Sequence, residues 1–245
     1  KYLALARNIE VWLPPGYDET PERRYQVLYM QDGQNLFDPR IAYTNTDWGV
    51  DEAITRLVDA GKIEPVIVVA TWYTVARFDE YDPWGKGPQY AKFLMEEVMP
   101  MVNTKYRTLT GPENTGVMGG SMGGLISFYL GLKHPDVFGK VGCMSTYFIW
   151  NGDVKNPGDR PPLIEKILCD PTIHFPKTVK AYFDYGTGGE DAAFEPLQLK
   201  VNEWLKKDGL MEGRDFISRK FEGADHSNKA WRARLDTPLE FLFAK

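Results

Sequence analysis

The sequence has few of the features that mark disulfide frameworks, metal sites, membrane spans or nucleic-acid surfaces. Its 245 residues include two cysteines, Cys143 and Cys169, which lack CxxC spacing and are expected to be free thiols, at least partly buried. Its most apolar stretches, 65–72 and 141–150, are far shorter than the ~18–20 residues that span a bilayer. The net charge is −5, and no lysine- or arginine-rich run is present. We therefore expect no metal, no membrane partner and no nucleic-acid partner.

The sequence leaves the compartment and the oligomeric state open. The chain begins at Lys1 with neither a starting methionine nor the apolar segment of a signal peptide, as expected of a mature or trimmed form. We expect a soluble protein, either cytoplasmic or secreted or periplasmic with its signal removed.

The composition and the alternation of segments are typical of one α/β domain. Apolar residues make up 43% of the chain and charged residues 26%, and no repeat or linker interrupts it, so we expect a single domain over 1–245. Short apolar runs alternate with stretches of helical period, which predicts a three-layer sandwich with a mostly parallel central sheet. Segment 9–13 is expected to pair antiparallel with 25–30. The predicted strands are 9–13, 25–30, 66–70, 115–118, 141–144, 179–184 and 215–221. The predicted helices are 48–60, 88–105, 124–133, 162–169, 195–208 and 227–243.

A G-x-S-x-G motif lies between a predicted strand and a predicted helix, at 119–123. Only five serines occur in the chain, so a chance match in this context is rare. A serine at such a sharp turn projects its hydroxyl from the carboxyl edge of the sheet, where the following helix points its N–H groups. Ser121 is therefore predicted to be a nucleophile.

A serine nucleophile needs a base, and the chain offers three histidines. His134 ends the helix that leads away from the motif, and His174 precedes a strand at the opposite edge of the sheet. His226 follows the last predicted strand, at the carboxyl edge, and is predicted to be the base.

The third member of such a triad is an acid that orients the imidazole and lies between the serine and the histidine in the chain. Asp184 is disfavoured because it lies within a predicted strand. The loop that follows ends in two carboxylates, Glu190 and Asp191. Asp191 is the preferred acid and Glu190 the alternative.

Two backbone N–H groups are expected to bind the oxyanion of the reaction. One is that of Met122, the residue after the nucleophile, and the other is that of Gln34, in the loop after the second strand. Arg77 follows the predicted strand 66–70 and Trp48 lies where a loop leads into a predicted helix, among many aromatic residues, and both are candidates for substrate contact. Ordinary packing is the alternative for such aromatic residues.

These residues resemble those of the putative-esterase family of α/β-hydrolases, which includes esterase D, feruloyl and acetylxylan esterases and enterochelin-esterase-like proteins. The resemblance implies an α/β-hydrolase fold with little or no lid, a Ser-acid-His site and no metal or organic cofactor. Asp32-Gly33 stands where many α/β-hydrolases have His-Gly, and the acid loop is longer than in feruloyl esterases. The similar segments are 29–38, 48–51, 77–81, 119–124, 135–139, 186–187, 226 and 231–234.

Together these observations predict a serine carboxylic-ester hydrolase that works through an acyl-enzyme. The resemblance implies a small-molecule or carbohydrate ester as substrate, carrying an acetyl or feruloyl group. The alternatives are an acyltransferase to a sugar hydroxyl with the same triad, an enterochelin-type siderophore esterase, and a non-catalytic binding module that keeps the fold.

Overall fold

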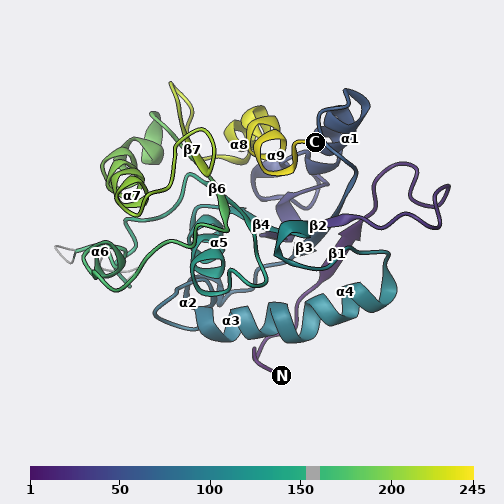
Figure 1. Cartoon of the computed structure of the whole chain (residues 1–245), viewed down its shortest axis with the longest axis horizontal. Coiled ribbons are helices and arrows are strands. Elements are labelled where there is room, and N and C mark those ends of the chain that lie inside the picture. Colours follow the sequence, from purple (N-terminus) through teal and green to yellow (C-terminus); the bar gives the residue numbers. More distant parts are fainter. Residues whose placement is uncertain (153–160) are drawn as a thin grey trace.

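The central sheet of the structure, a computed structural model that describes residues 1–152 and 161–245, has the order β1-β3-β2-β4-β5-β6-β7 (Figure 1). Strand β1 is antiparallel to β3, and the remaining neighbours are parallel. The mostly parallel sheet predicted from the sequence is confirmed. Its strands are β1 (Ile9–Trp12), β2 (Gln26–Gln31), β3 (Val66–Thr71), β4 (Thr115–Gly120), β5 (Lys140–Met144), β6 (Lys180–Gly186) and β7 (Phe216–Phe221).

The pairing expected for the first strand is wrong. Strand β1 pairs with β3, in a register that joins Ile9 to Thr71 and Trp12 to Val68, and not with β2. The reason is that β2 lies between β3 and β4 and forms parallel ladders with both of them. No edge of β2 is left for an antiparallel partner, so the chain crosses over to the outer edge of β3.

Helices cover both faces of the sheet, which gives the three layers. On one face α3, α5 and α7 contribute side chains such as Tyr90, Leu125 and Trp204 to one apolar core. On the other face α1, α8 and α9 contribute side chains such as Ile54 and Leu239 to a second core. Figure 1 shows α3 and α4 along one side of the sheet and α8 and α9 on the opposite side. The helices are α1 (Val50–Asp59), α2 (Arg77–Glu80), α3 (Gly87–Phe93), α4 (Met99–Lys105), α5 (Met122–Lys133), α6 (Glu165–Leu168), α7 (Glu195–Lys207), α8 (Asn228–Arg234) and α9 (Asp236–Phe243).

Shorter helical turns connect these elements. A π-helical segment, η3 (Leu94–Val98), joins α3 to α4, so that the helix predicted over 88–105 is continuous. The helix predicted over 227–243 is instead divided into α8 and α9. The 3₁₀ turns are η1 (Gly33–Asn35), η2 (Tyr43–Asn45), η4 (Pro112–Asn114) and η5 (Gly189–Ala193).

Two expectations about composition can be compared with the structure. Cys143 and Cys169 are both free, as expected, and Cys143 is buried, but Cys169 is exposed. Within the described ranges, no helix combines the length and the apolar character needed to cross a membrane.

Helix α5 is the central helix of the fold, because almost all of its residues are buried against β4 and β5. Gly131, in its last turn, allows this close approach: a Cβ atom there would lie 2.4 Å from Cγ2 of Val141 in β5. Val141 is β-branched, so its methyl group cannot rotate away freely.

Gly131→Ala is therefore expected to destabilise the protein, although alanine ordinarily stabilises a helix by about 1 kcal/mol relative to glycine. The overpacked side chain should lower the free energy of unfolding by about 1–3 kcal/mol. Urea denaturation followed by circular dichroism measures this. An unchanged or higher free energy of unfolding would show that the α5–β5 contact can relax.

Candidate active site

Ser121 occupies a strained turn between β4 and α5. Its backbone dihedrals are φ 59° and ψ −125°, a region that residues other than glycine rarely adopt. The turn is held by two backbone hydrogen bonds: the Ser121 N–H donates to the carbonyl of Met144 at 3.0 Å, and its carbonyl accepts from the N–H of Tyr147 at 3.1 Å. The side chain of Ser121 is thus fixed at the carboxyl edge of the sheet, as the motif predicts.

Gly119 and Gly123 let the strand and the helix approach each other at this turn. A Cβ atom on Gly119 would lie 2.7 Å from the backbone carbon of Gly123, and one on Gly123 would lie 3.0 Å from Cβ of Gln31. Gly119 is therefore required by backbone packing, whereas a side chain at Gly123 would require the side chain of Gln31 to shift.

The Ser121 hydroxyl opens into a cavity of about 510 Å³ that His226 also lines. Within the described part of the chain, this hydroxyl takes part in no hydrogen bond to another protein group. Candidate catalytic bonds of this kind are often loose before substrate binds. The cavity brings together the predicted nucleophile and the predicted base.

His226 lies in the loop between β7 and α8, and its ring is held on three sides. Nδ1 lies 2.6 Å from Oδ1 of Asp191, while the rings of Trp231 and Phe194 meet the imidazole edge-on at centroid distances of 4.9 and 5.3 Å. The imidazole is therefore held in place where it lines the cavity of Ser121.

The acid beside His226 is Asp191, in η5, and not Glu190, whose side chain is exposed. Asp191 is fully buried, and its Oδ2 accepts hydrogen bonds from the hydroxyl of Ser145 at 2.5 Å and the N–H of Gly186 at 2.9 Å. Burial raises the pKa of Asp191, but the hydrogen bonds from His226 and Ser145 outweigh it and hold the pKa below the ordinary value. The carboxyl group is therefore ionised at neutral pH.

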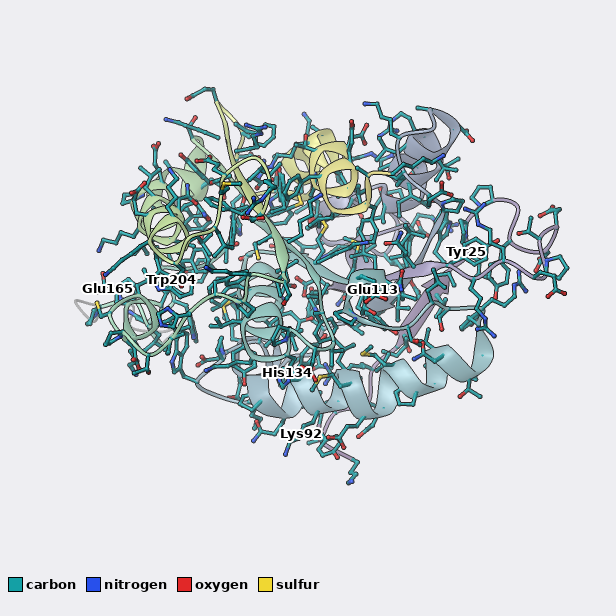
Figure 2. All side chains as sticks on the ribbon, in the orientation of Figure 1. Tyr25, Lys92, Glu113, His134, Glu165 and Trp204 are labelled. Atoms are coloured by element: carbon teal, nitrogen blue, oxygen red, sulfur yellow. The ribbon has the colours of Figure 1, made fainter. Side chains whose placement is uncertain are left out.

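The other two histidines lie outside this cavity. His134, labelled in Figure 2, caps the carboxyl end of α5. His174 lies 2.8 Å from Oδ1 of Asp208 and is exposed. Their positions agree with the sequence argument that set them aside.

The two residues predicted to bind the oxyanion have different surroundings. Met122 is the first residue of α5, so its N–H has no acceptor within the helix and lies next to Ser121. The side chain of Gln34, in η1, accepts from the N–H of Tyr73 at 3.1 Å and donates to its carbonyl at 3.4 Å. Gln34 thus joins its loop to the segment after β3, and it is not among the residues that line the cavity.

Arg77 lies in the cavity wall, bound to Asp32. Its Nε and Nη2 donate to the two oxygens of Asp32 at 2.7 and 2.6 Å. Burial acts to lower the pKa of Arg77, but the adjacent Asp32 carboxylate outweighs it and raises that pKa. This pairing accounts for the aspartate in the Asp32-Gly33 sequence, at the end of β2.

Trp48 does not line the cavity. Its side chain is 2% exposed, its indole N–H donates to Oδ1 of Asn228 at 3.0 Å, and its ring packs on Trp231 at 5.1 Å. A Cβ on Gly120 would lie 3.0 Å from this ring, so Trp48 supports the turn of Ser121 from behind. The contact with substrate suggested by the sequence is replaced by packing.

Several residues of the site were not found from the sequence. Asp32, Asn35 and Tyr43 line the cavity, and Ser145 binds Asp191. Asp32 and Arg77 have opposite charges and follow β2 and β3, which are neighbours in the sheet, and this signal could have indicated their pairing. Ser145 has no such signal, because a lone serine after a strand is common.

Among the described residues, one group of acidic side chains could approach a metal ion: Asp47, Asp51 and Glu52. Arg232 donates to Asp47 at 2.5 Å and to Glu52 at 3.2 Å. A guanidinium therefore already supplies positive charge at this group, which lies outside the cavity of Ser121.

Comparison with known proteins identifies the family. Residues 1–242 match the sequence profile of the Putative esterase family. The chain belongs to this family. It is a carboxylic-ester hydrolase with the α/β-hydrolase fold, as the sequence predicts.

Two similar proteins differ in how much of their own length this chain matches. The uncharacterized protein YbbA of Bacillus subtilis is 27% identical and is matched over 98% of this chain and 93% of its own length. An endo-1,4-beta-xylanase/feruloyl esterase of Xylanibacter ruminicola is 29% identical over 97% of this chain, which spans only 29% of that longer protein.

Two solved structures are also similar. The enterobactin esterase of Shigella flexneri matches with a TM-score of 0.76 at 16% identity, over 96% of this chain and 54% of that one. A CE1 ferulic acid esterase from Anaeromyces mucronatus, in complex with ferulic acid, matches with a TM-score of 0.70 at 25% identity, over 96% of this chain and 84% of that one.

The lowered pKa of Asp191 predicts how stability depends on pH. A group whose pKa falls on folding stabilises the native state above its unfolded pKa, and this contribution is lost as the pH falls through the folded value. We expect Asp191→Asn to lower the free energy of unfolding by about 1–3 kcal/mol at pH 7. The difference from the wild type should shrink below pH ~4. Urea denaturation of both proteins between pH 3 and 7 measures it; a difference independent of pH would contradict the assigned ionisation.

Proposed function

We propose that this esterase acts through an acyl-enzyme formed on Ser121, with His226 as base and Asp191 as the carboxylate that orients it. The observation that carries the proposal is the cavity shared by Ser121 and His226, with Nδ1 of the imidazole fixed at 2.6 Å from the buried Asp191. Because Asp191 binds Nδ1, Nε2 is left to accept the proton of the serine.

In the proposed reaction, Oγ of Ser121 attacks the ester carbonyl while Nε2 of His226 takes its proton. The N–H of Met122, beside Ser121 at the start of α5, stabilises the tetrahedral oxyanion, and the N–H of Gln34 stays the predicted second donor. The intermediate collapses as the imidazolium returns the proton to the departing alcohol, which leaves the acyl group on Ser121. Water then enters, His226 takes one of its protons, and the acid is released as Ser121 regains a proton.

The cavity wall favours an aromatic acyl group over acetyl. Tyr43, Val75 and Phe78 line it with apolar surface that is exposed, 72% for Tyr43 and 98% for Val75. Exposed apolar side chains gathered at one cavity indicate a binding surface for an apolar ligand. We propose a feruloyl-type ester of a carbohydrate as substrate, with the ring on this wall and Arg77 in contact with its polar substituents. The names of the xylanase/feruloyl esterase and ferulic acid esterase relatives support this choice.

Ser121→Ala is expected to lower kcat on 4-nitrophenyl acetate by at least about 10³-fold, since no other group provides the nucleophile. The thermal midpoint should change little, because the hydroxyl has no partner among the described protein groups. Ser218→Ala, a half-buried position in β7, is the matched control and should keep wild-type kcat. Labelling by a fluorophosphonate, followed by mass spectrometry, reports the reactive serine directly. An unlabelled Ser121 in the folded wild type would support a non-catalytic binding module instead.

The acyl preference can be measured with esters that share a leaving group. We expect kcat/KM for 4-nitrophenyl ferulate to exceed that for 4-nitrophenyl acetate by at least about tenfold, because the aromatic ring buries apolar surface on the wall. Phe78→Ala should reduce this ratio by about 3–10-fold.

Natural substrates decide among the alternatives. Release of ferulate from feruloylated xylan supports the proposal. Preferential cleavage of acetylated xylan or of enterobactin would replace it with an acetyl or siderophore esterase. Dominant acyl transfer to an added sugar in water would show an acyltransferase.

A further inference from the structure

Ser145 lies immediately after β5 and is completely buried behind the proposed triad. Its φ of 41° lies in the region that favours glycine, so its backbone is strained. The backbone is held there by Asp184, whose carbonyl and Oδ1 accept from the Ser145 N–H at 3.0 and 3.1 Å. A strained, buried serine in contact with a candidate catalytic carboxylate calls for a physical explanation.

The partners of the Ser145 hydroxyl fix the direction of its proton. The indole N–H of Trp231 lies 3.0 Å from Oγ, and Nη2 of Arg234 lies 2.7 Å from it. Indole and guanidinium groups are donors only, so they occupy both lone pairs of the oxygen. The hydroxyl has one proton, and the remaining neighbour is Oδ2 of Asp191 at 2.5 Å. Ser145 is therefore a donor to Asp191.

The hydrogen bond that Ser145 donates affects both the ionisation and the orientation of Asp191. Its Oδ2 accepts from both Ser145 and the N–H of Gly186, so a proton on that oxygen would displace a hydrogen bond. The other oxygen, Oδ1, is then left for Nδ1 of His226. These hydrogen bonds fix the orientation of the Asp191 carboxylate and favour its ionised form.

Arg234 supplies the positive charge of this buried cluster. Its Nε and Nη2 donate to the two oxygens of Asp184 at 3.1 and 3.0 Å, and Nη2 lies 3.6 Å from Oδ2 of Asp191. Each Asp184 oxygen accepts a second bond, Oδ1 from the Ser145 N–H and Oδ2 from the Tyr182 hydroxyl. Two carboxylates thus share one guanidinium, and the cluster lacks one positive charge until His226 is protonated.

We propose that Ser145 and Arg234 are positioning residues that hold Asp191 ionised and aimed at His226, so that the imidazolium formed during catalysis completes the charge balance of the cluster. This inference rests on the proposed function of Ser121, Asp191 and His226. Neither residue touches the cavity of Ser121. The alternative is that the cluster only joins β5, β6 and α8.

The first test removes the hydroxyl. Ser145→Ala and Ser145→Gly both lack the donor, and glycine also relieves the positive φ. We expect both to lower kcat on 4-nitrophenyl acetate by about 10–100-fold, the range found for groups that orient a functional side chain. KM should change by less than about twofold, since Ser145 itself does not line the cavity. Ser127→Ala is the matched control: Ser127 is equally buried, but its hydroxyl donates to the carbonyl of Gly123 at 2.7 Å.

The second test asks whether Ser145 acts through Asp191. In an Asp191→Asn background, the Ser145 substitutions should change kcat by less than about twofold, because residues that act as a unit are not additive. A purely structural role predicts that the two losses multiply, and that result would overturn the proposal. Arg234→Lys keeps the positive charge but loses the bidentate hydrogen bonds to Asp184. It should therefore lower kcat when Asp191 is present and leave kcat unchanged in the Asp191→Asn background. It carries the same test if the Ser145 variants do not fold.

The outcomes separate this inference from the proposed function. If Asp191→Asn alone keeps wild-type kcat, the proposed triad is wrong. If Asp191→Asn lowers kcat but the Ser145 and Arg234 variants match Ser127→Ala, the triad stands and the positioning role is wrong. If the Ser145 and Arg234 variants lower kcat in the wild-type background but not in the Asp191→Asn background, the result supports both the proposed triad and the positioning role.

Discussion

The structure depends on one buried carboxylate that must keep its hydrogen bonds satisfied. Asp191 receives bonds from Ser145 after β5, from Gly186 at the end of β6 and from His226 after β7, so three neighbouring strand ends converge on it. An unpaired buried charge costs several kcal/mol, so these three segments are held in one arrangement. Gly186 shows how tight this is, because a Cβ atom there would lie 2.0 Å from the carbonyl oxygen of Ala224.

The features that sequence reasoning found are those with a local physical cause. Strands β3 and β4 are continuous buried runs, and the G-x-S-x-G turn needs glycines within a few residues of the serine. Both signals lie within a few consecutive residues of the sequence. The partner of β1 could not be read in this way, because it depends on β2 being enclosed between two parallel neighbours.

The sequence favoured Asp191 but left Glu190 open, since a shift of one residue in η5 decides which carboxylate points inward. The decision is made by packing with segments 35 and 46 residues away in the chain, at His226 and Ser145. The same limit explains Trp48: its sequence position after a loop indicated the cavity, but contacts with Asn228 and Trp231 draw it behind the sheet edge.

The chemistry and the segment of the cavity wall that follows β3 are anchored by separate groups. The wall segment after β3 is held by Arg77 on Asp32, and by a buried ion pair in which Arg7 lies 2.8 Å from Glu80 of α2. The proposed triad is held by the cluster of Arg234, Asp184 and Ser145. Among the described residues, no hydrogen bond or ion pair joins one set of side chains to the other. Residues of the wall segment after β3 can therefore change without touching the carboxylate or its partners, so that one fold can keep its chemistry while its substrate changes.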